Sequence, residues 1–257
     1  MYTAEVKFTI NKKVKDDSQT DLVELIFGSW RMNGQVLGDT YFSFIKNKNL
    51  IVQVLIPAKD SLSTKYANRY LKSSYKKLES VGLSKPRIKI LGEEPHYYNK
   101  CKCKKVKEYI LYTTYVQLEP ALRCKKCFGY IPLYKIPPIY DNSEYYPLIT
   151  WQSDYQACDT LQMNCIVGEK FGMKEMYDHQ SDLSKQGRYV CKKIEKLTGK
   201  KTYYYLYTYR AKNRKKELKR KCPKCKGEWL RKETLHNKFD FECTKCRLLS
   251  NIAWDVR

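Results

Sequence analysis

The sequence predicts an α+β fold for this chain of 257 residues. Three observations support the prediction. Apolar residues in the first 94 positions switch between the period of strands and the period of helices. Residues 143–199 keep the helical period over most of their length. Two sets of closely spaced cysteines stand on either side of that helical segment.

Residues 1–94 predict a ferredoxin-like domain, because their elements follow the order strand, helix, strand, strand, helix, strand. We expect the strands at 4–10, 41–45, 50–56 and 87–91, and the helices at 22–30, after capping residues between Asp16 and Thr20, and at 67–78. This fold hosts RNA-binding modules, metal chaperones and enzymes, so it does not select a function. Phe42 and Phe44 share one face of the second strand, and we expect them in the core rather than on a base-stacking surface.

The segment 211–257 contains two Cys-x-x-Cys pairs, Cys222 with Cys225 and Cys243 with Cys246. A hairpin-sized loop separates the pairs, which is the spacing at which thiolates from two turns converge on one zinc ion. Disulfides and free core cysteines are the alternatives. We predict a zinc ribbon whose four sulfur ligands leave no open position, which is typical of a structural site rather than a catalytic one.

A second set of cysteines in residues 95–140 repeats this arrangement. Cys101 and Cys103 are one residue closer than usual, and Cys124 and Cys127 form a normal pair. We predict a second structural zinc ribbon here, with a strand from Tyr109 to Val116. Lysines around the first pair could offset the charge of the thiolates instead of binding a ligand. The proline-rich stretch 131–138 predicts an extended strap or, alternatively, a ligand for an aromatic groove.

Residues 141–210 predict a helical segment that ends in a tyrosine-rich strand over 203–209. Cys158 and Cys165 lie on the apolar stripe of the first helical stretch, so we expect them in the core. Cys191 lies beside the stripe of the second stretch, which should end at Gly199. None of these three cysteines has a partner at metal-ligand spacing.

The chain carries a formal net charge of +23, and a cationic field of this size attracts polyanions. The cations are densest just before the last cysteine set, and tyrosines precede them. Aromatic rings beside cations suit single-stranded nucleic acid, whereas the alternative is a core strand followed by a solvated linker. The residues predicted to contact phosphates are Lys212, Arg214, Lys215, Lys216, Lys219 and Arg220, and those predicted to stack on bases are Tyr207, Tyr209 and Trp229.

Catalytic motifs are sparse. The three histidines, His96, His179 and His236, lie in no recognisable metallohydrolase or nucleophile motif, and neighbouring carboxylates such as Glu93 and Glu94 fall in expected turns. A nuclease that uses Asp159 stays a minor alternative. We therefore expect a non-enzymatic protein that binds DNA or RNA.

Because the start has no apolar signal region and eleven cysteines suit a reducing compartment, we expect the protein in the cytoplasm. The alternative function is that of a protein-interaction module, such as an immunity or inhibitor protein that neutralises an acidic toxin or enzyme.

Several motifs accompany the four cysteine pairs: Pro132-Leu133-Tyr134-x-Ile136-Pro137, Trp151-x-x-x-Tyr155-x-x-x-Asp159-x-Leu161, Gly187-Arg188, Tyr203-Tyr204-Tyr205-Leu206, Trp229 and Arg247-Leu248. In these motifs, residues 95–257 resemble a bacterial family of zinc-ribbon-containing proteins of uncharacterised function for which nucleic-acid binding has been suggested. The resemblance implies a zinc ribbon with affinity for nucleic acid and implies no catalytic activity.

Overall fold

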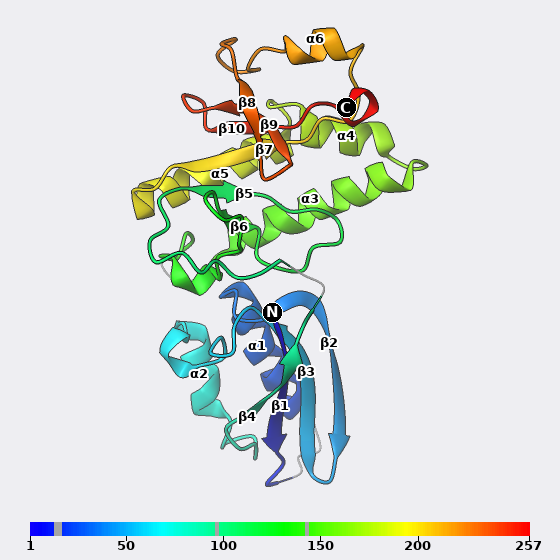
Figure 1. Ribbon diagram of the computed structural model, residues 1–257. Coiled ribbons are helices and arrows are strands. Elements are labelled where there is room, and N and C mark those ends of the chain that lie inside the picture. Colours follow the sequence, from blue (N-terminus) through cyan, green and yellow to red (C-terminus); the bar gives the residue numbers. More distant parts are fainter. Residues whose placement is uncertain (13–16, 96–97, 142–143) are drawn as a thin grey trace. The chain divides into compact units, whose positions relative to one another are not determined.

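The computed structural model describes residues 1–12, 17–95, 98–141 and 144–257, without the side chains of 39–41 (Figure 1). Asp16, His96 and Ser143, which the sequence analysis names, lie outside the described residues. The chain forms two compact units, each described by itself. Unit 1 contains Met1–Lys100, Leu118–Pro120 and Tyr130–Tyr146, and unit 2 contains Cys101–Gln117, Ala121–Gly129 and Pro147–Arg257.

Unit 1 is built on a four-stranded antiparallel sheet with the strand order β2-β3-β1-β4. The predicted order of elements is confirmed, and the bounds are β1 (Tyr2–Thr9), α1 (Ser18–Met32), β2 (Leu37–Lys46), β3 (Asn49–Ile56), α2 (Arg69–Lys77) and β4 (Arg87–Glu93). Apolar residues from both helices pack on one face of the sheet, where Val6, Trp30 and Leu71 belong to one buried cluster.

The opposite face of this sheet carries Phe42 and Phe44, so the prediction that they lie in the core is wrong. Their side chains are 81% and 45% exposed. Phe42 pairs with Gln53 and Phe44 with Ile51, on the face away from the helices. The period of two shows that both residues share a face, but it does not show which face, and β2 is an edge strand with a partner on one side only.

Unit 2 is built on a six-stranded sheet with the order β6-β5-β7-β10-β9-β8. Its strands are β5 (Tyr109–Leu111), β6 (Leu122–Cys124), β7 (Thr202–Leu206), β8 (Leu230–Leu235), β9 (Phe239–Cys243) and β10 (Leu248–Ser250). The three central strands β5, β7 and β10 run parallel, and the outer pairs are antiparallel. The boundaries predicted from the sequence lie at residues 140 and 210, whereas the sheet contains strands from all three predicted segments. The tyrosine-rich strand also ends earlier than predicted, at Leu206.

The helices of unit 2 are α3 (Tyr146–Asn164), α4 (Glu169–Tyr177), α5 (Asp182–Thr198) and the short α6 (Arg214–Leu218). Helix α5 packs closely against β7 at Gly187 and ends at Gly199, which has a φ of 67°, as predicted. Cys158 and Cys191 are buried, but Cys165 lies beyond the end of α3 and is exposed, so its predicted core position is wrong. Every helix within the described part of the chain is too short or too polar to cross a membrane.

Candidate metal centres and nucleic-acid interface

The last four predicted cysteines converge in unit 2. The sulfur atoms of Cys222, Cys225, Cys243 and Cys246 all lie within 4.8 Å of one another, and those of Cys225 and Cys243 are 3.6 Å apart. Sulfurs at ~2.3 Å from a tetrahedral zinc ion would be about 3.8 Å apart, which fits this group. The separation is far longer than the ~2.05 Å bond of a disulfide, so the thiols are free.

Tight backbone turns present these sulfurs. In the first turn the Cys222 amide donates to the Gly227 carbonyl at 2.9 Å, and the Lys226 amide donates to the Cys222 carbonyl at 2.9 Å. Lys226, directly after the second cysteine, has a positive φ of 59°, and Arg247 holds the same place in the other turn with a φ of 56°. The backbone amide of Gly227 lowers the pKa of Cys225 to about 7, whereas burial raises the pKa of Cys243 and of Cys246.

The earlier four cysteines form a similar group. Sulfur atoms lie 3.9 Å apart between Cys124 and Cys103, and 3.5 Å apart between Cys127 and Cys101, and all four lie within 4.8 Å. The normal pair repeats the turn geometry, because Phe128 after it has a φ of 60°. The shorter pair instead closes with the Cys103 amide donating to the Cys101 sulfur at 3.4 Å. Both groups could therefore hold a metal ion such as zinc.

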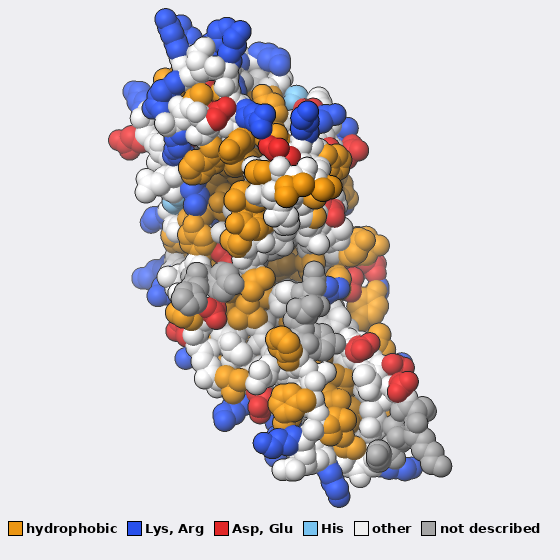
Figure 2. All heavy atoms as spheres, turned by 90° about the vertical axis from the view of Figure 1, so that its right-hand side faces the viewer, with side chains coloured by type: hydrophobic (Ala, Val, Ile, Leu, Met, Phe, Trp, Pro, Cys, Tyr) orange, Lys and Arg blue, Asp and Glu red, His pale blue; other side chains and the backbone are white. Residues whose placement is uncertain are grey.

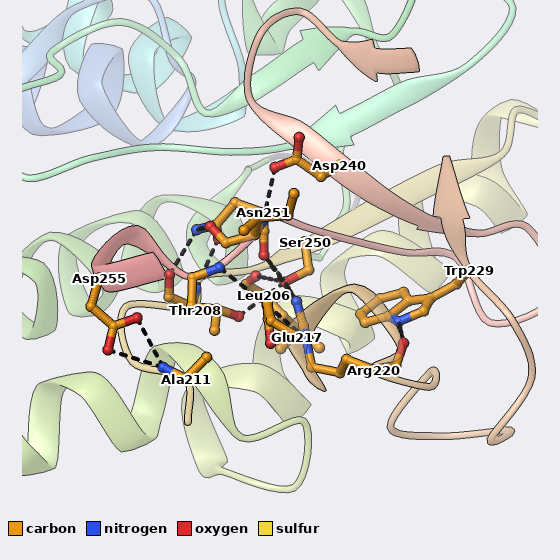
Figure 3. Close-up of polar contacts among 12 residues, drawn as sticks. Leu206, Thr208, Ala211, Glu217, Arg220, Trp229, Asp240, Ser250, Asn251 and Asp255 are labelled. Atoms are coloured by element: carbon orange, nitrogen blue, oxygen red, sulfur yellow. Dashed lines mark hydrogen bonds and ion pairs between the residues drawn. The ribbon is translucent and has the colours of Figure 1, made fainter. Parts of the chain in front are cut away.

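The predicted phosphate-contacting residues divide into two kinds. Lys212, Arg214, Lys215, Lys216 and Lys219 are exposed on and around α6. Arg220 is different, because its side chain is only 16% exposed and forms an ion pair with Glu217 at 3.1 Å. Its guanidinium also donates to the Ser250 hydroxyl and the Asn251 carbonyl, as Figure 3 shows. The predicted phosphate contact of Arg220 is therefore wrong, because the side chain is mostly buried and its Nε and Nη2 groups already donate to protein groups.

Trp229 is also buried rather than available to a base. The ring is 2% exposed, stacks at a tilt against Phe241 and lies under the Arg220 guanidinium. Its indole N–H donates to the Arg220 carbonyl at 2.8 Å (Figure 3). The predicted stacking role of Trp229 is wrong for this reason. Tyr207 and Tyr209 are half-buried and line a cavity beyond the end of β7.

Replacing Arg220 with alanine is expected to lower the free energy of unfolding of unit 2 by about 3 kcal/mol, because it leaves the buried Glu217 carboxylate without its counter-charge. Lys216→Ala, at an exposed position of α6, is the control and should change stability by less than ~0.5 kcal/mol. Urea unfolding followed by circular dichroism measures both. An Arg220→Ala protein as stable as the control would contradict this structural role.

A basic groove that the sequence analysis missed lies between α5 and the turns of the last cysteine group, with a volume of about 640 Å³. Its cationic lining residues are Lys185, Arg188, Lys192 and Lys196 from α5, and Lys224, Lys245 and Arg247 from the cysteine turns. Glu195 is the only acidic residue in this lining, and it pairs with Arg247 at 3.2 Å. The signal was the three- and four-residue spacing of cations along α5, which places them on one helical face.

The described histidines have structural surroundings. His236 shares a hydrogen bond of 2.7 Å with the Lys125 carbonyl and stacks on Phe128. The side chain of His179 lies 3.8 Å from the Asp178 carboxylate, and burial and the nearby Arg188 lower its pKa. Neither belongs to a metal-ligand group among the described residues.

Fold and site together define a mixed α+β protein with two four-cysteine groups. Family models match residues 1–92, 103–207 and 211–256, and each is described only as a domain of unknown function (DUF8589, DUF2310 and DUF8594). An uncharacterised protein of Haemophilus influenzae is 33% identical over 264 residues, covering 99% of both chains, and this chain belongs to the same family. Another uncharacterised protein of that organism is 43% identical over 150 residues, which is 57% of this chain and 71% of the relative.

Proposed function

We propose that this protein binds nucleic acid without catalysing a reaction, and that unit 2 supplies the binding surface. The observation that carries the proposal is the groove between α5 and the last cysteine group, where cations from separate elements line one concave surface. Successive phosphates of a single strand would each meet positive charge in such a groove. The exposed cations of α6 add to the field of the same unit and would assist association.

We further propose that zinc occupies both four-cysteine groups as a structural ion. All-sulfur ligation favours zinc over hard cations, and four protein ligands leave no position for a reactive water. The role of zinc here is to fix the turns that carry Lys224, Lys245 and Arg247, so the metal shapes the groove rather than contacting nucleic acid. In this arrangement unit 2 contains two zinc ribbons.

For unit 1 we propose the ferredoxin-like class. The support is the order of its elements, together with a sheet in which β1 lies between β3 and β4 and each neighbouring pair is antiparallel. For the compartment we propose the cytoplasm, because unbridged thiols in metal-ligand arrangement suit a reducing environment.

The test of the proposed function is a salt titration of binding to a fluorescein-labelled single-stranded oligonucleotide, followed by anisotropy. The wild-type protein should lose at least tenfold in affinity between about 50 and 200 mM salt, because bound phosphates release counterions. Replacing Lys185, Lys192 and Lys196 with glutamate should weaken binding by about a hundredfold or more and flatten the salt dependence.

The matched control reverses three exposed lysines of unit 1, Lys72, Lys76 and Lys77, and so changes net charge equally. This control should keep most of the affinity if the groove carries the binding. Equal losses in the two variants would show that net charge rather than the groove attracts the strand. A wild-type protein that binds no oligonucleotide at low salt would overturn the proposal.

A second candidate function is a protein-interaction role for unit 1. Phe42, Phe44 and Ile45 are exposed together on edge strand β2, and an exposed apolar edge favours a protein partner. In this case the chain itself would be an immunity or inhibitor protein that binds its target through β2. Phe42→Ser with Phe44→Ser should then abolish a specific protein complex and leave oligonucleotide binding unchanged. A complex that survives both substitutions would remove this candidate.

A further inference from the structure

A second cavity in unit 2, of about 610 Å³, lies where the three parallel strands end. Its lining includes Tyr112 and Tyr115 after β5, Tyr205 and Tyr207 at the end of β7, and Trp254 after β10. In open sheets of parallel strands, ligands bind beyond the carboxyl ends of the strands, and this cavity occupies that position. Figure 2 views the side toward which β7 points in Figure 1, and there hydrophobic side chains gather with lysine and arginine side chains beside them.

Aromatic rings form both the floor and the mouth of this cavity. Tyr112, Tyr155 and Tyr205 are buried at the floor, whereas Tyr115 and Trp254 are exposed, and the Trp254 side chain is 55% accessible. A flat aromatic ligand fits between such rings, because base-to-aromatic stacking works for every base. The lining gathers rings from three strand ends and from α3, so this is a shaped aromatic cavity and not a single exposed side chain.

Asp159, on α3, is a buried carboxyl group in the lining of the cavity. Its side chain is 7% exposed, and its Oδ2 accepts a hydrogen bond of 2.8 Å from the Tyr115 amide. No described residue donates to its Oδ1. Burial raises the pKa of this carboxyl, so a donor that entered the cavity would stabilise the carboxylate.

The side-chain amide of Asn251 nearby differs from Asp159, because protein groups already satisfy its hydrogen bonds. Its oxygen accepts from the Tyr205 hydroxyl and the Thr208 amide, and its nitrogen donates to the carbonyls of Thr208 and Ile252. Asp159 is therefore the buried side chain whose hydrogen-bonding capacity a ligand could use.

We propose that this cavity holds one unpaired nucleobase that carries an exocyclic amino group, and that Asp159 Oδ1 accepts a hydrogen bond from that amino group. The proposal rests on the proposed nucleic-acid binding and adds a preference to it. Cytosine, adenine and guanine have such an amino group, whereas uracil and thymine present a carbonyl oxygen there, which a carboxylate repels. The cavity would therefore discriminate against uracil and thymine.

Both cations and carboxylates stand at the mouth of the cavity. Lys238 and Arg257 line it, and the Arg257 guanidinium lies 5.3 Å from the centre of the Trp254 ring. The acidic residue at the mouth, Asp255, accepts the Ala211 amide with both carboxylate oxygens. The Arg257 guanidinium also pairs with the Asp240 carboxylate at 3.7 Å, so positive and negative charges are balanced at the mouth, and the bound base makes the proposed specific contact.

The test compares labelled single-stranded octamers of cytidine and of uridine, titrated by anisotropy with the full zinc-loaded chain. The wild type should bind the cytidine octamer about tenfold more tightly, which is the effect of one hydrogen bond to a charged group. Asp159→Asn keeps an acceptor for the Tyr115 amide and turns a donor toward the cavity, so the preference should vanish or reverse toward uridine. Asp154→Asn, at an exposed position of the same helix, should keep the wild-type preference.

Trp254→Ala gives an independent readout, because the exposed ring contributes little to stability. It should weaken both octamers by about tenfold through lost stacking, and leave their ratio unchanged. Salt-sensitive binding without a preference between the octamers, or a preference that Asp159→Asn leaves intact, would overturn the base pocket while the groove proposal stands. Absence of binding to either octamer would overturn both.

Discussion

Replacing Cys243 with serine should leave about one zinc ion per chain, where we expect two in the wild type, and should unfold the turns around the last cysteine group. Cys243 ends β9 and pairs with Leu248 of β10, so a metal ion held there would tie β9 to the strand beside β7. Structural zinc contributes on the order of 10 kcal/mol in small zinc-binding peptides, which is comparable to the whole stability of a domain. Elemental analysis and thermal unfolding of the purified variant measure the two effects.

The control for this substitution is Cys165→Ser. Cys165 is an exposed cysteine outside both groups, so its replacement removes a thiol of the same kind without removing a ligand. It should keep two zinc ions and the wild-type melting temperature. A Cys243→Ser protein that behaves in the same way would contradict zinc binding at the last group.

Replacing Gly187 with alanine should destabilise unit 2 by about 3 kcal/mol, because α5 and β7 touch at this position. A methyl group there would lie 2.1 Å from the Tyr204 ring and 2.6 Å from the Trp151 indole nitrogen. Both rings are fully buried and cannot move aside without opening the core. The helix that carries four cations of the groove would shift, so oligonucleotide affinity should fall together with stability.

The matched glycine is Gly28 within α1, where an added methyl group would meet nothing within 4 Å. Gly28→Ala should stabilise unit 1 by up to about 1 kcal/mol, since alanine favours the helix. Denaturant unfolding of both variants, with hydrogen exchange to separate the two units, tests the pair. A Gly187→Ala protein of unchanged stability would show that α5 packs less closely on β7 than the structure places it.

Periodicity was sufficient to predict the order of elements in unit 1, because each strand and helix there keeps one clear apolar repeat. It was insufficient for Phe42 and Phe44, since alternation cannot identify which face of an edge strand the helices cover. The eight cysteines in the two groups were predictable from spacing alone, because each normal turn holds both of its sulfurs within a few residues.

The proposed interface was less predictable, because it depends on contacts between distant residues. Arg220 looks like its cationic neighbours in the sequence, and only its contacts with Ser250 and Asn251 distinguish it. The groove joins α5 to cysteine turns about thirty to sixty residues later, and the aromatic cavity joins the ends of three strands. The run of cations in the sequence therefore led to predicted phosphate contacts on and around α6, and the cations of α5 were overlooked.

Photo-crosslinking tests the central claim most directly. A single-stranded oligonucleotide with a photoreactive base would be crosslinked to the zinc-loaded protein at low salt, and the attached peptides would be mapped by mass spectrometry. We expect crosslinks in α5 between Lys185 and Lys196 and in the turns at Lys224 and Lys245. Crosslinks confined to unit 1 would contradict binding in the groove of unit 2. Crosslinks that stay unchanged when Lys185, Lys192 and Lys196 are replaced with glutamate would contradict it as well.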